Sequence, residues 1–176
     1  EMSHITKEFP GVRALDDVTM RVRKGDIHAI CGENGAGKST LMKILAGAEQ
    51  PDGGEILLHG TPLRIHSPIE GMAAGISIIY QEFCLVPSMS VEENIFLGRE
   101  PVAAGGFVRW RAMRRRAVEL LTSLDAPIDP AAPVESLSVA QQQMVEIAKA
   151  VSVEARVIAM DEPTAALTER EIERLF

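Results

Sequence analysis

Short apolar runs alternate along this chain with stretches in which apolar residues recur every three or four positions. The short runs, at 27–31, 55–60, 75–80 and 157–160, are rich in isoleucine, valine and leucine and adjoin glycine-containing or polar segments. Runs of this length and composition are typical of strands buried in a sheet. Strands that alternate with helices indicate an α/β protein with a mainly parallel sheet.

Helical spacing marks three further segments, each with an apolar stripe that predicts an amphipathic helix. The stripes are Leu41, Ile44 and Leu45 ahead of a terminating Gly47; Trp110, Met113, Ala117, Leu120, Leu121 and Leu124; and Val145, Ala148 and Val151. Two loops, 101–106 with paired glycines and 126–133 with three prolines, accompany the later helices. We therefore divide the chain into an α/β core, residues 1–87 and 157–176, and a helical insertion, residues 88–156.

Composition narrows the class of protein. The 176 residues are 46% hydrophobic, enough for an ordinary core, and no apolar run reaches the ~18 residues of a membrane-spanning helix. The first residues lack the pattern of a secretory signal. Cys31 and Cys84 belong to no metal-binding or disulfide framework, which favours a reducing, cytoplasmic setting. A net charge of −7 argues against nucleic acid as the main partner.

Residues 32–40 fit the phosphate-loop pattern G-x-x-x-x-G-K-[ST], between a predicted strand and a predicted helix. The glycines let backbone N–H groups turn toward phosphate oxygens, Lys38 supplies a cation for the β- and γ-phosphates, and the Ser39 hydroxyl can bind Mg²⁺. The alternative, an incidental glycine-rich turn, is disfavoured by the strand and helix on either side. We predict nucleoside triphosphate binding by Gly32, Glu33, Asn34, Gly35, Ala36, Gly37, Lys38, Ser39 and Thr40.

Two carboxylates, Asp161 and Glu162, follow the apolar run at 157–160. A carboxylate at a strand end beside a phosphate loop can hold Mg²⁺, directly or through water, and this is the role we predict for Asp161. Glu162 is placed to polarise a water for attack on the γ-phosphate. A solvated acidic turn is the alternative, and the phosphate loop upstream makes it the weaker one.

The order and spacing of several blocks extend this picture to the whole chain. They are FPGVRALDDV (9–18), GENGAGKSTLMKILAG (32–47), YQE (80–82), VEENIFLGRE (91–100), ESLSVAQQQMVEIAKA (135–150) and MDEPTAALTERE (160–171). With these blocks the sequence resembles the nucleotide-binding domain of ATP-binding-cassette (ABC) importers, most closely the first half of the tandem ATPase subunits of monosaccharide importers. The resemblance implies a P-loop NTPase core with an ABC-type helical subdomain.

The resemblance also implies roles for residues that carry no signal alone. Phe9 matches an aromatic that stacks on adenine, although a core aromatic is the alternative. Gln81 matches a glutamine that reaches Mg²⁺ and the attacking water. Ser138 and Gln141 lie in the family's signature, which heads a helix and faces the γ-phosphate held by an opposite domain. We therefore expect Lys38, Gln81 and Glu162 to be catalytic and Ser39, Gln81 and Asp161 to bind the metal ion.

By the same resemblance, we expect hydrolysis of ATP with Mg²⁺ to energise import of a monosaccharide. The implied partners are a second nucleotide-binding domain, membrane permease subunits and, indirectly, a periplasmic sugar-binding protein, with the chain peripheral at the cytoplasmic face of the inner membrane. A cassette in DNA repair or translation is the alternative, together with a nucleotide-binding fragment without turnover. Three departures bear on these expectations: Val139-Ala140 replace paired glycines, Thr168 replaces an aspartate, and the sequence stops before the family's switch histidine.

Arginines crowd the start of the predicted 110–124 helix: Arg109, Arg111, Arg114, Arg115 and Arg116. We interpret them as a solvated helix face. An electrostatic contact with a membrane surface or a partner is the sharper hypothesis. Nucleic-acid binding is the least favoured, because the chain is acidic overall.

Overall fold

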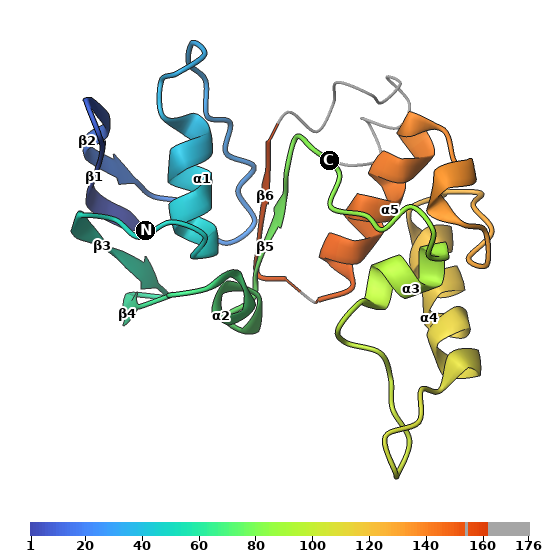
Figure 1. Ribbon diagram of the computed structural model, residues 1–176. Coiled ribbons are helices and arrows are strands. Elements are labelled where there is room, and N and C mark those ends of the chain that lie inside the picture. Colours follow the sequence, from blue (N-terminus) through green and yellow to red (C-terminus); the bar gives the residue numbers. More distant parts are fainter. Residues whose placement is uncertain (154, 162–176) are drawn as a thin grey trace. The chain divides into compact units, whose positions relative to one another are not determined.

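The computed structural model describes residues 1–153 and 155–161 (Figure 1). The chain forms two compact units, the first from Glu1 to Ser77 and the second beginning at Ile78. The division into a core of residues 1–87 and 157–176 and a helical insertion of 88–156 stays a prediction.

The first unit contains a four-stranded sheet with the order β2-β1-β3-β4. Every neighbouring pair in this sheet is antiparallel, so the mainly parallel sheet predicted from the sequence is not what the first unit forms. Its strands are β1 (Met2–Phe9), β2 (Val12–Met20), β3 (Gly53–Leu58) and β4 (Thr61–Leu63). The predicted strand at 55–60 is thereby confirmed as β3, with its last two residues in a turn.

The hairpin of β1 and β2 lacks the strict alternation that reveals a strand in a sequence. Irregular register interrupts the pairing, and His4 (φ 55°) and Asp17 (φ 52°) adopt left-handed conformations. The His4 ring nitrogen Nδ1 lies 2.6 Å from the Asp17 carboxylate across the pair. As a result Met2 and Ile5, three residues apart, are both buried, a spacing that does not predict a strand.

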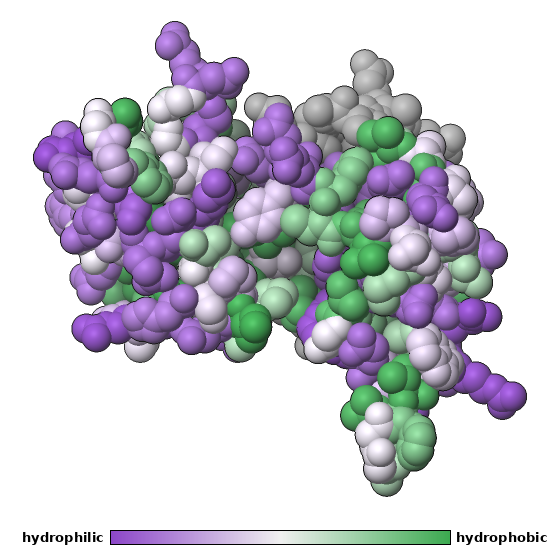
Figure 2. All heavy atoms as spheres, in the orientation of Figure 1, coloured by the Kyte–Doolittle hydropathy of each residue, from purple (hydrophilic) through white to green (hydrophobic). Residues whose placement is uncertain are grey.

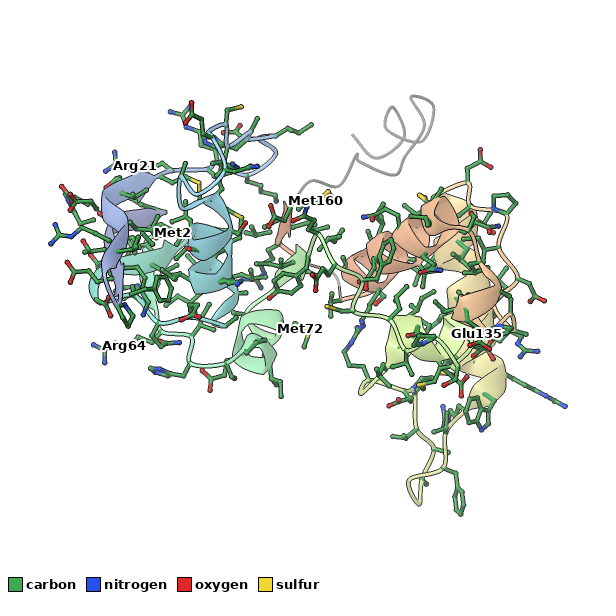
Figure 3. The ribbon with its side chains drawn as sticks, turned by 45° about the horizontal axis from the view of Figure 1, so that its top comes forward. Met2, Arg21, Arg64, Met72, Glu135 and Met160 are labelled. Atoms are coloured by element: carbon green, nitrogen blue, oxygen red, sulfur yellow. The ribbon has the colours of Figure 1, made fainter. Side chains whose placement is uncertain are left out.

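Helix α1 (Lys38–Ala46) confirms the helix predicted after the phosphate loop. Its apolar stripe, led by Leu41, Ile44 and Leu45, is buried, and Gly47 ends it in a left-handed conformation. Figure 3 shows Met2 on β1 among the side chains between the sheet and α1, and Met2 is almost fully buried. A shorter helix, α2 (Pro68–Ala73), contacts α1 and begins at Ser67, whose hydroxyl accepts the Glu70 N–H.

The strand predicted at 27–31 is wrong for this structure. Residues 26–33 form neither a helix nor a ladder, and 71% of the Ile27 surface is exposed. A strand needs a neighbour whose backbone groups complete its hydrogen bonds. Within the first unit the edge strands β2 and β4 do not pair with this segment, so its apolar side chains stay outside the core.

The second unit buries its apolar residues among helices. These are α3 (Val91–Phe96), α4 (Trp110–Ser123), α5 (Val139–Val151) and a single 3₁₀ turn, η1 (Val134–Ser136). The fully buried members include Val91, Ile95, Met113, Ala117, Val134, Val145 and Ala148. Both helices predicted by spacing are thus confirmed. Trp110 is the exception, because it begins α4 with 54% of its surface exposed rather than joining the apolar face.

The remaining strands, β5 (Ile76–Ile79) and β6 (Val157–Met160), confirm two further predictions and pair with each other. The N–H of Asp161, the residue after β6, donates to the carbonyl of Ile79, the last residue of β5, at 2.9 Å. Both strands therefore end at the same edge, as neighbouring parallel strands do. The hydrogen bond at Ile79 therefore fixes the position at which the segment beginning with Tyr80 and Gln81 leaves β5.

Buried polar side chains tie the loops of the second unit to its helices. Asn94 on α3 is completely buried, and its amide bonds both the N–H and the carbonyl of Val86. Its Nδ2 also donates to the carbonyls of Met89 and Ser90. Across the helices, Arg114 on α4 holds the buried Glu92 carboxylate through two hydrogen bonds of 2.8 and 2.9 Å.

Helix α5 holds the peptide groups of Cys84 by two side chains one turn apart. The Glu146 carboxylate accepts the Cys84 N–H at 2.6 Å, and the Lys149 ammonium donates to the Cys84 carbonyl at 2.8 Å. Glu146 is buried in α5, between Val145 and Ile147. The segment after Gln81 is therefore fixed to α5 three residues downstream of the glutamine.

Burial raises the pKa of Glu146 above its usual range, against smaller opposing effects of Lys149 and of the Cys84 hydrogen bond. A carboxyl with a raised native pKa binds more protons in the folded than in the unfolded chain between the two pKa values. The free energy of unfolding then falls as the pH rises from the ordinary carboxyl value, about 4.3, through the raised native value.

We predict that Glu146→Gln removes this part of the pH dependence, because the amide oxygen still accepts the Cys84 N–H without carrying a charge. Glu146→Ala leaves that N–H without its partner and should cost about 1–3 kcal/mol at every pH. Urea unfolding of the purified chain at several pH values measures both effects. Glu135→Gln, at an exposed position labelled in Figure 3, is the matched control and should behave like the wild type. An unchanged pH dependence in Glu146→Gln would contradict the assignment.

Candidate functional site

The phosphate-loop pattern leads directly into α1, whose N-cap is Gly37. No side chain caps this end, although serine, threonine, aspartate and asparagine are the usual caps. The first N–H groups of a helix have no partner inside the helix, and the helix dipole gives this end a partial positive charge. The start of α1 thus presents backbone donors and positive potential, which is the chemistry that an anion requires.

Glycine is required at position 37 for two reasons. Its φ of 89° is in the left-handed region, which side chains with a Cβ rarely adopt. A Cβ there would also overlap the carbonyl oxygen of Ala14 and approach the Leu15 side chain on β2. Gly35, with φ 84°, needs glycine for its backbone conformation alone, since the space around it is open. The two glycines therefore set the curvature of the loop and its contact with the sheet.

Lys38, the first residue of α1, reaches back across the loop. Its Nζ donates to the carbonyl of Gly32 at 2.7 Å and to that of Glu33 at 3.0 Å. The Ala36 N–H also donates to the Glu33 carbonyl, at 3.2 Å, which closes the turn. The lysine ammonium is thereby held against the backbone of a loop whose other residues, from Gly32 to Ala36, are exposed.

Phe9 lies in the same unit, as the last residue of β1. The residue is 38% exposed, so the alternative of a core aromatic does not describe it. The Lys7 ammonium lies 5.4 Å from the ring centroid, a cation–π contact that covers part of the ring. An exposed aromatic at a strand end is available for stacking against a flat ring.

Gln81 and Asp161 lie in the second unit, beyond the ends of β5 and β6. The hydrogen bond from Asp161 to Ile79 brings the two chain segments together at this edge. Met160, labelled in Figure 3, is the last residue of β6 and precedes Asp161. Carboxylate and amide oxygens therefore share one end of the strand pair, and Mg²⁺ prefers such oxygen ligands.

Ser138 and Gln141 form a capping box at the start of α5. The Ser138 hydroxyl accepts the Gln141 N–H at 3.3 Å, and the Gln141 side-chain oxygen accepts the Ser138 N–H at 3.0 Å. This confirms that the signature heads a helix. Val139, which replaces the first signature glycine, is 58% exposed and so presents its branched side chain at the helix start.

The predicted site residues are thus grouped within each unit. The first unit holds Phe9 and the loop of residues 32–40, and the second holds the pair Gln81 and Asp161 and the pair Ser138 and Gln141. Glu162 and Thr168 lie outside the described residues. Binding of a metal ion by Ser39, Gln81 and Asp161 stays a prediction. Among the described residues no cluster of three or more His, Cys, Asp or Glu could hold a metal ion.

No pattern in the sequence predicted roles for three residues that position the segment after Gln81. Glu146 and Lys149 bind the backbone of Cys84, and Asn94 binds that of Val86. One signal was present: Glu146 interrupts the apolar stripe of α5, and an acidic residue among buried positions requires a partner. In the described part of the chain no helix is both long and apolar enough to cross a membrane.

Comparison with known proteins extends these observations. A model of the ABC transporter family matches residues 15–165. The chain is 58% identical over 176 residues to the ribose import ATP-binding protein RbsA 1 of Rubrobacter xylanophilus. It is 53% identical over 176 residues to a putative ribose/galactose/methyl galactoside import ATP-binding protein of Hahella chejuensis. In both cases all of this chain is covered, but it spans only 35% and 34% of the relatives' length.

Solved structures agree with the sequence relatives. The ADP conformation of MJ1267, an ATP-binding cassette of an ABC transporter, superposes with a TM-score of 0.80 at 26% identity, covering 99% of this chain and 72% of that one. The same TM-score and identity relate the chain to a dimeric post-hydrolysis state of the cassette MJ0796 bound to ADP and Pi, covering 99% and 78%. The fold is therefore that of a P-loop NTPase of the α/β class, and the chain belongs to the ABC transporter family.

Proposed function

We propose that this chain is the ATP-binding and ATP-hydrolysing cassette of an importer for a monosaccharide. The observation that carries the proposal is the uncapped start of α1 with Lys38 held across the loop. The printed names of the relatives, which are ribose and ribose/galactose/methyl galactoside import proteins, support sugar as the cargo. In this proposal the chain works at the cytoplasmic face of a membrane and drives a permease. A periplasmic sugar-binding protein delivers the sugar to that permease.

Binding begins with stacking of adenine on Phe9 and with phosphate oxygens at N–H groups of the loop, those of Gly35, Gly37 and Lys38 among them. Lys38 exchanges its contacts with the Gly32 and Glu33 carbonyls for the β- and γ-phosphates. Because a carbonyl is neutral and a phosphate is charged, this exchange gives stronger hydrogen bonds. The triphosphate therefore replaces the two loop carbonyls as the hydrogen-bond partner of Lys38.

The metal site of the proposal consists of Ser39, Gln81 and Asp161. Bound Mg²⁺ would neutralise charge on the phosphate oxygens as the bond to the leaving diphosphate breaks. Glu162 accepts a proton from the attacking water as its oxygen bonds to the γ-phosphorus. The products are ADP and phosphate, and the signature of a second cassette, corresponding to Ser138 and Gln141 here, completes the site from the opposite side.

Hydrolysis is coupled to transport by the preference of ATP for a closed pair of cassettes. A ligand shifts a two-state equilibrium by the difference in its affinity for the two states. The segment from Gln81 to Cys84 connects the metal site to α5, the helix that begins with the signature, because Glu146 and Lys149 on α5 bind the backbone of Cys84. A change of position at Gln81 is thereby passed to α5.

We predict that Lys38→Ala weakens binding of Mg·ATP by about ten- to a hundredfold, because charged hydrogen bonds to phosphate are lost. Titration of the purified chain with a fluorescent ATP analogue measures the change. Lys43→Ala is the matched control, since Lys43 is exposed at the other end of the same helix. Equal affinity of the Lys38→Ala variant and the wild type would overturn the proposed phosphate site.

We predict that Glu162→Gln in the full-length protein retains ATP binding but lowers hydrolysis at this site by about 10²–10⁴-fold, the usual contribution of a general base. Phosphate release at saturating ATP gives the rate, and the titration above gives the affinity. Glu55→Gln, at an exposed position of β3, should hydrolyse ATP like the wild type. Wild-type turnover by the Glu162→Gln variant would show that another group accepts the proton.

A further inference from the structure

The loop between α3 and α4 forms a tight hairpin that projects beyond the helices of the second unit (Figure 1). Val102 and Val108 form an antiparallel bridge, and the Ala103 N–H donates to the Phe107 carbonyl at 2.8 Å. The Arg109 N–H donates to the Pro101 carbonyl at 2.7 Å. The hairpin is thus held by its own backbone hydrogen bonds and keeps a defined shape.

This hairpin exposes large apolar side chains that the unit's own packing leaves uncovered. Phe107 is 77% exposed and Val102 57%, and Trp110 at the start of α4 is 54% exposed. We call these three residues the apolar tip. Figure 2 shows the projecting hairpin with mostly apolar and neutral colouring, next to hydrophilic residues of the same unit. Large apolar side chains exposed along one short segment mark a surface that contacts another body.

Five arginines lie between positions 109 and 116, next to the apolar tip in the sequence. Arg114 is committed to Glu92, and Arg115 lies 3.9 Å from the exposed Glu119. The other three, which we call the arginine cluster, are exposed and form no ion pair within residues 1–153 and 155–161: Arg109, Arg111 and Arg116. The solvated helix face expected from the sequence therefore describes only part of this group.

The fold of α4 does not account for these arginines. Arg109 is its N-cap and Arg111 lies in its first turn, which contains no acidic residue. Cations at a helix N-terminus oppose the helix dipole and destabilise the helix. The chain as a whole carries a net charge of −7, so this local excess of positive charge also runs against its composition. A polyanionic partner is the complement of such a surface.

We propose that the apolar tip and the arginine cluster bind the surface of an anionic lipid bilayer. Aromatic and aliphatic side chains enter the boundary between headgroups and acyl chains, and arginines stay at the level of the lipid phosphates. At every point of its surface, a bilayer offers lipid phosphates next to apolar acyl chains. A projecting hairpin can enter it without the preformed pocket that a protein partner must supply.

This contact lies apart from the proposed nucleotide site in sequence and in chemistry, and it is tested separately. Vesicles of phosphatidylcholine, with or without phosphatidylglycerol, are added to the purified chain. Trp110 is the single tryptophan, so its emission reports directly on the apolar tip. We expect sedimentation with phosphatidylglycerol vesicles and a blue shift of the emission, both weakened by salt, and little binding to neutral vesicles.

The variants separate the two parts of the surface. Phe107→Ser should weaken vesicle binding about tenfold or more, as burial of the ring is lost. Replacing Arg109, Arg111 and Arg116 together by glutamine should weaken it by up to about a hundredfold, at roughly fivefold for each charge. The matched controls are Ile69→Ser on α2, at 74% exposure, and Arg64→Gln, at an exposed position labelled in Figure 3; both should bind like the wild type.

Absence of binding to phosphatidylglycerol vesicles by the wild type would overturn the proposal, and so would unchanged binding by the variants. If the same variants instead weaken assembly with permease subunits in detergent, while vesicle binding is lacking, the surface contacts a protein and the lipid proposal fails. Affinity for the ATP analogue should be unchanged in every variant. A wild-type chain that binds vesicles but not the analogue would contradict the proposed function and leave the lipid contact intact.

Discussion

The close approach of Gly37 to the backbone of β2 is the constraint on which the first unit depends. The Ala14 carbonyl oxygen occupies the space that a Cβ at position 37 would need. Because the loop passes so near the sheet, α1 begins at Lys38 and places its open N-terminus beside the β1–β2 hairpin. A larger residue there would displace the helix start, and the donors that a phosphate requires would move with it.

A different kind of constraint holds the second unit. Its helices pack through an ordinary apolar core, but the connections between them are fixed by buried polar side chains. Asn94 forms hydrogen bonds with four backbone groups of the neighbouring loop. Glu146 accepts the N–H of Cys84, and Lys149 donates to its carbonyl. Such groups are costly to bury without partners, so each bond also restricts which loop conformations the unit can adopt. The same bonds fix the segment after Gln81 to α5.

The sequence predicted those elements whose structure follows from the local pattern of residues. The start of α1 follows from the phosphate-loop pattern, the strands that precede Gln81 and Asp161 follow from their short apolar runs, and the stripe of α4 follows from its spacing. The β1–β2 hairpin did not, because left-handed residues such as His4 break the alternation on which recognition of a strand depends. The 27–31 segment failed for the opposite reason: its apolar pattern suits a strand, but a strand exists only with a neighbour. Glu146 shows a third limit, since its role is defined by a contact with Cys84, 62 residues away along the chain.

The central claim is that backbone N–H groups at the start of α1 hold the phosphates of ATP. Amide hydrogen exchange, measured in the chain with and without Mg·ATP, tests it at the atoms concerned. We expect slower exchange on nucleotide addition at Gly35, Gly37 and Lys38, with little change in α2, and loss of that protection in Lys38→Ala. Exchange at these amides that is unaffected by Mg·ATP, or protection that persists fully in Lys38→Ala, would contradict it.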